Sequence, residues 1–287
     1  MKRFILFILS ITLSVAALAQ DLYPTQLQEE KTYPVGSFHS LSVSSRFEVT
    51  LQEGPCNVKV TADQALLPYF QVYVRGGVLY IEADSKSIPA DVKKIYRGKN
   101  APVPVVRAIV TMPAVNSVSL HQNAILSSNG TVFSDSLKLS VEDKAILRNL
   151  KFDTPTADIA LSKHAVADFA LVATNVTLKG EGSSRTTMSF KGAVLKVDLS
   201  GSAHCKVIGE SETFSFHCER SSELDGLQMK APRVKADMKG GCEARVLAEE
   251  LLSVRLTGGS SLYYAGFPTI QVDEILRSTF APYKEKE

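Results

Sequence analysis

The sequence contains no tryptophan and only four cysteines among its 287 residues, and its formal net charge is only +2. Four cysteines are too few for a scaffold that depends on dense disulfide bonding. Lys2 and Arg3 lie in a leader that we expect to be removed, which leaves 30 basic residues against 30 acidic ones. A net charge near zero gives no electrostatic basis for binding nucleic acid or an anionic membrane surface.

Recognisable catalytic and cofactor motifs are also missing. The chain has no phosphate-binding loop, dinucleotide fingerprint, zinc-protease helix or nucleophile elbow. It has no CxxC pair to build a structural zinc site. The pairs His204-Cys205 and His217-Cys218 place neighbouring side chains on opposite sides of a strand, so neither pair can grip one ion. We therefore expect no metal, no cofactor and no enzymatic activity.

The first 19 residues have the order of a secretory signal peptide. Lys2 and Arg3 form a positive end, residues 4–18 are apolar, and residues 17–19 form a small-x-small cleavage site. That run is too short to span a membrane comfortably, and no later stretch approaches the ~20 apolar residues that a spanning helix needs. We expect an exported protein without a transmembrane segment, located in the periplasm, at the outer membrane surface or outside the cell.

Residues 20–115 are predicted to form an N-terminal β region. Apolar and polar residues alternate within residues 38–83, which is typical of short antiparallel strands with one buried side. Gly76 and Gly77 separate two such strands and predict a hairpin, because primed turns need positive φ.

Two segments interrupt this alternation. Residues 63–69 indicate one helical turn with Asp63 as its cap. Residues 84–105 are rich in proline and lysine and indicate an exposed insertion, with a short helix over residues 90–96. An excursion of this length inside a compact region is often functional, although a plain surface loop is the commoner case.

From residue 116 to residue 270 the chain repeats itself. Each unit has an apolar anchor that is followed, four places later, by a small residue. The anchors are Leu120, Val141, Leu161, Leu178, Leu199, Cys218, Met238 and Leu256, and the small partners are Ala124, Ala145, Ala165, Gly182, Ala203, Ser222, Cys242 and Ser260. Successive anchors are 17 to 21 residues apart.

A period near twenty with β-type alternation is typical of a β-solenoid, because stacked units bury the apolar side that one unit cannot bury alone. A leucine-rich repeat would show a recurring asparagine and a helical segment, and a left-handed hexapeptide helix would show a strict six-residue rhythm. Neither is present. We predict an all-β protein, namely a right-handed parallel β-helix of about eight rungs of about 20 residues, preceded by short antiparallel strands.

Residues 271–287 are expected to form a C-terminal cap and a solvated tail. Aromatic residues near this end are expected to cover the last rung, whose free edge would otherwise pair with other chains. They are Tyr263, Tyr264, Phe267, Phe280 and Tyr283. The alternative is a docking surface for a second copy of the chain.

The chain resembles a known family, the putative auto-transporter adhesin, head GIN domain family, over about residues 34–270. Short segments in a fixed order carry the likeness: residues 35–38, 41–43, 47–51, 79–81, 112–113 and 199–203. The chain departs from the family where Arg46-Phe47 replaces a frequent Gly-Ile, and only the rung at Leu199 keeps the full Leu-Ser-Gly-Ser-Ala. The resemblance implies an exported β-helical protein of Bacteroidetes type with a surface or binding role, and it supplies no catalytic residues.

One candidate site follows from the repeat register. The position before each anchor points outward and stacks along the helix, and in the later rungs it carries Asp198, His217, Asp237 and Arg255. Such a column can bind a polar ligand or perform acid–base chemistry. The competing interpretation is ordinary charge complementarity between exposed strands.

The sequence is compatible with three functions. The leading hypothesis is a non-enzymatic, adhesin-like binding module at the bacterial cell envelope, whose partner is a glycan or an envelope protein. The alternatives are a polysaccharide lyase or hydrolase with a lateral groove, and a structural envelope protein. Association of β-helices side by side or end to end would make a homo-oligomer.

Overall fold

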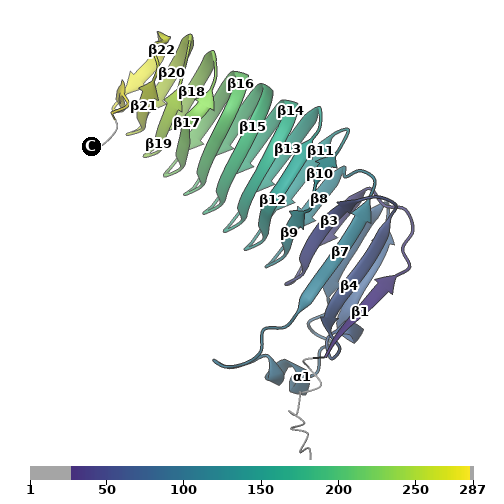
Figure 1. Cartoon of the computed structure of the whole chain (residues 1–287). Coiled ribbons are helices and arrows are strands. Elements are labelled where there is room, and N and C mark those ends of the chain that lie inside the picture. The colour runs from purple at the N-terminus through teal and green to yellow at the C-terminus, as the bar shows by residue number, and fades with distance from the viewer. Residues whose placement is uncertain (1–26, 285–287) are drawn as a thin grey trace, which may run out of the picture.

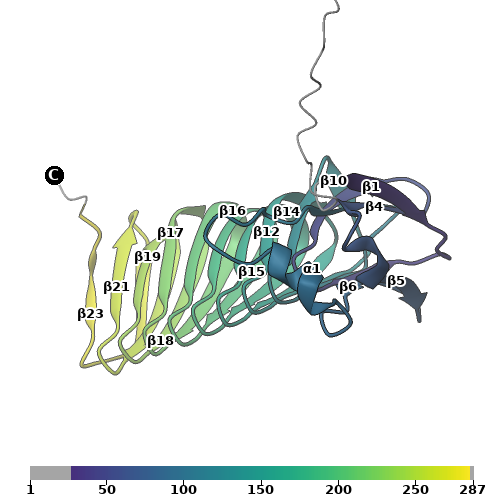
Figure 2. The same cartoon turned by 90° about the horizontal axis from the view of Figure 1, so that it is seen from below.

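The computed structural model describes residues 27–284, which form an elongated parallel β-solenoid of about nine turns (Figure 1). Each turn, called a rung below, contributes one strand to each of two stacks. Figure 2 shows the same rungs from below, following one another along a single axis. The all-β solenoid predicted from the repeat is therefore confirmed, and its rung count is close to the predicted eight. The predicted signal peptide, residues 1–19, lies outside the described residues.

The first stack begins at the N-terminal end of the solenoid, and each of its strands pairs with the next. Its strands are β5 (Phe70–Arg75), β6 (Val78–Ala83), β2 (Ser40–Val43), β8 (Ser117–Leu120), β11 (Leu137–Val141), β13 (Thr156–Leu161), the second halves of β14 (Val166–Gly180), β15 (Arg185–Leu199) and β16 (His204–Glu219), then β18 (Arg233–Lys239), β20 (Leu251–Thr257) and β22 (Thr269–Leu276).

The second stack lies beside the first and contains the other strand of each rung. Its strands are β1 (Gln28–Tyr33), β4 (Asn57–Asp63), β7 (Val106–Met112), β3 (Glu48–Glu53), β9 (Ile125–Ser128), β12 (Ile146–Asp153), the first halves of β14, β15 and β16, then β17 (Glu223–Lys230), β19 (Glu243–Leu247), β21 (Ser261–Ala265) and β23 (Thr279–Pro282). A short extra strand, β10 (Thr131–Phe133), pairs with the end of β12.

The core consists of inward columns in which each side chain lies against its equivalent on the next rung. Leu120, Val141 and Leu161 are in register on successive strands, and all three are buried. Leu126 and Leu147 form the matching column of the second stack. One rung cannot bury these residues alone, so the free energy of the core comes from stacking.

The register of one repeat differs from the prediction. Gly180, and not Leu178, lies between Leu161 and Leu199 in the anchor column. A Cβ on Gly180 would lie 2.9 Å from Cδ2 of Leu199, so the neighbouring leucine occupies the space that a side chain would need. A pattern defined by apolar anchors therefore assigns this repeat to Leu178 and misses Gly180. With Gly180 as the anchor, the irregular spacings around this repeat disappear.

The N-terminal region combines parallel and antiparallel pairing. β4 and β5 are antiparallel to their neighbours, as predicted for residues 38–83, and β1, which lies outside those residues, is antiparallel to β4. The β5–β6 hairpin turns at Gly76 and Gly77, both with positive φ. β2, β3, β6 and β7, however, are parallel rungs of the solenoid. The rung of β6 and β7 lies outside the rung of β2 and β3, although it comes later in the chain. The buried apolar residues between Phe38 and Leu262 form one core cluster that includes both the N-terminal region and the later rungs.

The insertion of residues 84–105 connects β6 to β7. It contains the predicted helix, α1 (Ala90–Ile95), which lies at the N-terminal end of the solenoid in Figure 1. The 3₁₀ helix η2 (Leu67–Tyr69) precedes β5, and its N-cap is Leu66. Asp63 therefore does not cap this helical turn, which corrects the prediction.

Candidate functional site

The predicted outward column is present and in register. Asp198 pairs with His217, His217 with Asp237, and Asp237 with Arg255, on four successive rungs of the first stack. The ladder extends one rung further at each end, because Lys179 pairs with Asp198 and Glu274 pairs with Arg255. We call these six residues the charged column.

Both additional members of the charged column were absent from the sequence prediction. With Leu178 as the anchor, the position before it is Thr177 and not Lys179, because the anchor of that repeat was assigned two residues too early. It did not reach Glu274, because the repeat was followed only to Leu256. With these additions the acidic and basic side chains alternate along the column, apart from His217 between its two aspartates.

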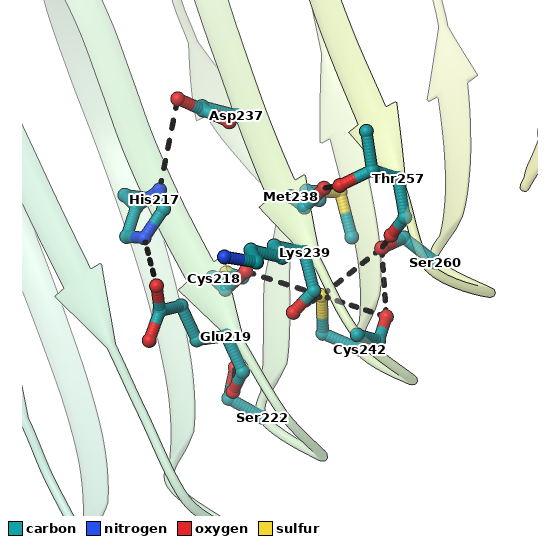
Figure 3. A network of polar contacts seen from close by, with 11 residues as sticks. His217, Cys218, Glu219, Ser222, Asp237, Met238, Lys239, Cys242, Thr257 and Ser260 are labelled. Atoms are coloured by element: carbon teal, nitrogen blue, oxygen red, sulfur yellow. Dashed lines mark hydrogen bonds and ion pairs between the residues drawn. The ribbon is translucent and has the colours of Figure 1, made fainter. Parts of the chain in front are cut away.

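His217 is the best connected member of the charged column (Figure 3). Its Nδ1 lies 3.8 Å from Oδ2 of Asp237 on the next rung. Its Nε2 lies 3.2 Å from Oε1 of Glu219, two residues further along the same strand. Each ring nitrogen therefore faces a carboxylate oxygen. The His217 and Asp237 side chains are each 38% exposed, so a ligand can reach both from solvent.

The inward side of the same rungs carries thiol and hydroxyl groups, which Figure 3 shows to the right of His217 and Asp237. The Cys242 thiol donates to the Cys218 carbonyl at 3.3 Å, and the Ser260 hydroxyl lies 2.7 Å from the Gly240 carbonyl that accepts from it. Small polar residues at these turns thus donate further hydrogen bonds to backbone carbonyl groups. Cys218 and Cys242 are buried, which confirms the inward positions inferred from the repeat.

Burial also determines the chemistry of the cysteines. It raises the pKa of the Cys205 thiol to about 12 and raises the pKa of the Cys218 thiol as well. Thiols with such pKa values stay protonated at neutral pH, which disfavours the thiolate that a nucleophile needs. All four cysteines are free thiols.

A second polar ladder lies on the outside of the second stack, and the sequence prediction missed it. His204 Nδ1 is 3.1 Å from Oε2 of Glu223, and Arg245 is 3.4 Å from Glu223 and also pairs with Glu243. Burial and these carboxylates act in opposite directions on the guanidinium, and the pKa of Arg245 is raised overall. The signal was present in the repeat, because these side chains lie five or seven places after each anchor.

The N-terminal end contains the largest departure from regular rungs. The Asp63 carboxylate is buried and accepts a hydrogen bond from the Tyr96 hydroxyl at 3.0 Å and from the Val105 amide at 3.3 Å. Burial, with the bond to Asp63, raises the pKa of Tyr96 above its usual range. One carboxylate therefore fastens both the end of α1 and the return of the insertion into β7. Under the fastened insertion lies a pocket of about 450 Å³, called the insertion pocket below.

The part of the chain that the structure describes contains no cluster of three or more His, Cys, Asp or Glu side chains that could hold a metal ion. Within the same residues, no helix is long and apolar enough to cross a membrane.

The chain is similar to one protein family and to several solved structures. A family model described as "Putative auto-transporter adhesin, head GIN domain" matches residues 37–268. Two structures called putative adhesins, from Parabacteroides merdae and Parabacteroides distasonis, align with TM-scores of 0.66 and 0.65 at 16% identity, covering 90% of this chain and 96% and 97% of theirs. A putative lipid binding protein from Parabacteroides distasonis aligns with a TM-score of 0.58 at 17% identity, covering 90% of this chain and 97% of its own. At these identities the structural likeness shows the fold alone. No curated protein matches the chain.

Proposed function

The chain belongs to the putative auto-transporter adhesin, head GIN domain family, and on that premise we propose that it is an exported, non-enzymatic binding module of the bacterial cell envelope. In this proposal the charged column binds a polar ligand, namely a glycan chain that runs along the solenoid axis. The signal peptide pattern supports export, and the family supports a binding role. The compartment within the envelope is the periplasm or the outer surface.

The observation that carries the proposal is the strict register of the charged column. Strands in a stack lie about 4.8 Å apart, so the column presents charged groups at that repeat along one side of the solenoid. A polymer of sugar units is also a regular extended array of hydroxyl groups. Carboxylates accept hydrogen bonds from hydroxyl groups and guanidinium groups donate them, so Asp198, Asp237 and Arg255 supply both roles.

A glycan binder often stacks sugar rings on exposed aromatic side chains. The charged column has none, so binding through it would rest on hydrogen bonds. Hydrogen bonds to charged groups are the stronger kind, typically worth about 1.5 to 3 kcal/mol each. Several rungs must therefore contribute together, which a ladder of six residues allows.

A second candidate, a polysaccharide lyase or hydrolase, is favoured by one observation. Asp198 and Asp237 are two rungs apart, about 9.6 Å at the usual strand spacing, and the carboxyl groups of inverting glycosidases are about 6.5 to 9.5 Å apart. We place it second because His217 lies between the two aspartates and contacts Asp237. The imidazole occupies the space in which a scissile bond and a water molecule would have to lie.

The test is a glycan array and a polysaccharide depolymerisation screen on the mature chain, with Asp198→Ala and Asp237→Ala, singly and together. Asp158→Ala is the matched control, because Asp158 is an exposed aspartate on β13 of the same stack but outside the charged column. We expect glycan binding that the double variant weakens at least about tenfold, on the scale of one lost charged hydrogen bond, and that the control leaves unchanged.

Two outcomes would overturn this proposal. Turnover that disappears in Asp198→Ala or Asp237→Ala would establish the enzyme instead. Absence of both binding and turnover would reduce the column to charge complementarity between strands and would favour a structural envelope protein.

A further inference from the structure

The insertion pocket lies at the opposite end of the solenoid from most of the charged column. Its walls come from the insertion, from the segment around η2, from the turn between β2 and β3, and from the turn before β9. Its volume of about 450 Å³ is within the range of roughly 300 to 1,000 Å³ that small-molecule sites occupy. Segments far apart in the chain therefore combine to form one cavity.

The inner walls of the pocket are apolar. Phe47, Leu66 and Phe70 line it from the solenoid side, and all three are buried. Ile88 and Val106 line it from the two ends of the insertion, and both are half-buried. A ligand can therefore cover the apolar area that Ile88 and Val106 still expose, and burying such area is the main source of binding free energy for a small molecule.

The polar lining of the pocket is one-sided in charge. Arg46, Lys93 and Arg97 contribute to the lining, and no aspartate or glutamate does. Within residues 27–284 none of the three cations forms an ion pair. This differs from the outward ladder of the second stack, where Arg245 pairs with Glu223 and Glu243. Three unpaired cations beside an apolar cavity attract a ligand that is apolar over most of its length and anionic at one end.

The cavity is also held in place before any ligand arrives. The Asp63 carboxylate binds both Tyr96 and Val105, so the insertion is fastened to the solenoid on either side of the stretch between α1 and β7. A preformed cavity loses less conformational entropy on binding than a loop that must first fold over its ligand.

We propose that the insertion pocket binds a single-chain amphipathic anion of the fatty-acid type. The acyl chain lies against Ile88, Val106 and the exposed edges of Leu66 and Phe70, and the carboxylate pairs with Arg46, Lys93 and Arg97. A sugar would leave the apolar walls without a partner, and a cationic amphiphile would face three like charges. The site is separate from the charged column, so it stands or falls independently of glycan binding.

The test uses the mature chain and dodecanoate below its micelle concentration, with binding measured by calorimetry. Dodecanol and dodecyltrimethylammonium carry the same chain with a neutral and a cationic head. We expect saturable one-to-one binding of dodecanoate, binding of dodecanol weaker by about tenfold, and no binding of the cation. Acetate has the head without the chain and should not compete.

The helix α1 supplies a matched pair of variants. Lys93 lines the pocket, whereas its neighbour Lys94 is exposed and does not. We expect Lys93→Gln to weaken dodecanoate binding by about tenfold with little effect on dodecanol, and Lys94→Gln to leave both unchanged. Ser85→Trp, which places a large ring in the pocket from an exposed position, should abolish the binding of both ligands.

Three results would overturn the proposal. The first is the absence of saturable dodecanoate binding by the wild-type chain. The second is equal weakening by Lys93→Gln and Lys94→Gln, which would indicate a general surface charge effect. The third is binding to anionic vesicles that Ser85→Trp leaves intact, which would assign the cations to a membrane surface. Because the charged column is distant, Asp237→Ala should change none of these values.

Discussion

At the N-terminal end of the solenoid the outermost strands are antiparallel to the rungs that they cover. At the C-terminal end the last rung is parallel to the rungs before it. β5 covers β6 in the first stack. In the second stack β4 covers β7 and β1 covers β4, and all three pairings are antiparallel. Beyond β22 and β23 no further strand is paired within the described residues. The side chains of Ile270 and Val272 point in the inward direction, yet they are 39% and 53% exposed.

The aromatic residues expected to cover the last rung do so only in part. Tyr264 and Phe280 stack with their ring centroids 5.0 Å apart, but Phe267 is fully exposed. The ion pairs of the described chain also end before this rung, the last of them at Arg245. Instead, two features of the edge hinder pairing with another chain. β22 contains a bulge, which disrupts the strand ladder, and β23 contains Pro282, which has no amide hydrogen to donate.

The contrast between the two ends shows that parallel stacking of rungs does not by itself define where the solenoid ends. Each rung is stabilised by the two rungs beside it, so an end must be closed by something other than another rung. The N-terminal end is closed by covering its apolar core. The C-terminal end leaves part of its core exposed and reduces the tendency of its edge to pair.

The largest expected effect is a difference in the free energy of unfolding between two phenylalanine variants, Phe47→Ala at the covered end and Phe280→Ala at the open end. Phe47 is completely buried and contacts Phe70, with ring centroids 4.8 Å apart. Phe47→Ala should lower the free energy of unfolding by about 3 to 5 kcal/mol, because it removes buried area and leaves a cavity. Phe280→Ala should cost only about 1 kcal/mol, the scale of one aromatic pair. Urea denaturation followed by circular dichroism measures both.

Equal losses in the two variants would contradict the comparison between the ends, because they would mean that the last rung is covered as well as the first. Hydrogen exchange distinguishes a local effect from a global one. In Phe280→Ala the increase in exchange should be confined to β21, β22 and β23, whereas Phe47→Ala should affect the whole N-terminal region.

The second prediction uses three buried cysteines as probes of where the solenoid opens. Cys242, Cys218 and Cys205 lie on successive rungs at increasing distance from the C-terminal end. A repeat array loses its rungs one after another from the less stable end. With iodoacetamide in dilute urea, we expect labelling in the order Cys242, Cys218, Cys205, with roughly tenfold between the first and the last.

Native burial protects these thiols, because the pKa of Cys205 is raised to about 12 and only an opened rung exposes a reactive thiolate. Mass spectrometry of tryptic peptides locates the label. Cys56, half-buried near the N-terminal end, is an internal reference whose labelling should not depend on opening from the other end. Labelling of all three buried cysteines at one rate would show that the solenoid opens as a single unit.

The sequence predicts the regular part of this fold well, for a physical reason. Inward columns require an apolar or small residue at a constant offset, so residues such as Leu199 and Ala203 mark every rung. The same offsets locate outward residues, which is why four of the six members of the charged column could be predicted. Gly180 could not be identified as an anchor from the sequence, because the side chain of Leu199 on the next rung fills the space that an apolar anchor would occupy. A pattern of side-chain types does not record such a contact between rungs.

The ends were harder to predict because they depend on contacts between distant segments. Local alternation in β2 and β6 indicates strands but not their direction or order, and β6 lies outside β2 only because the chain turns back after β5. The insertion pocket combines Phe47, Ile88 and Asn123, which no local pattern links. The hairpin at Gly76 and Gly77 was predictable, since its two positive-φ positions are adjacent in the chain.

The smallest expected effect concerns an exposed ion pair that joins the rungs of β11 and β13 near the covered end. Lys163 Nζ lies 2.6 Å from Oδ1 of Asp143, and that bond, with one from the Gln122 amide, lowers the pKa of Asp143 below its ordinary value of 3.8. A lowered pKa in the folded state means that the contribution to stability is present above about pH 4 and is lost as the pH falls through the folded-state pKa. The same contact raises the pKa of Lys163 above 10.5, so the contribution is also lost at very high pH.

Lys163→Met should therefore lower the unfolding midpoint slightly at pH 7 and not at all at a pH well below the lowered folded-state pKa of Asp143, where Asp143 is protonated in both the folded and the unfolded chain. Lys144→Met is the matched control, because Lys144 is an exposed lysine in the same turn as Asp143 and forms no ion pair within the described residues. Both side chains are solvated, so added salt should remove most of the difference at pH 7. A difference between the unfolding midpoints of Lys163→Met and Lys144→Met that persisted in acid would mean that Lys163 acts through the packing of its alkyl chain. This ion pair would then contribute nothing to the contrast between the covered end and the open end.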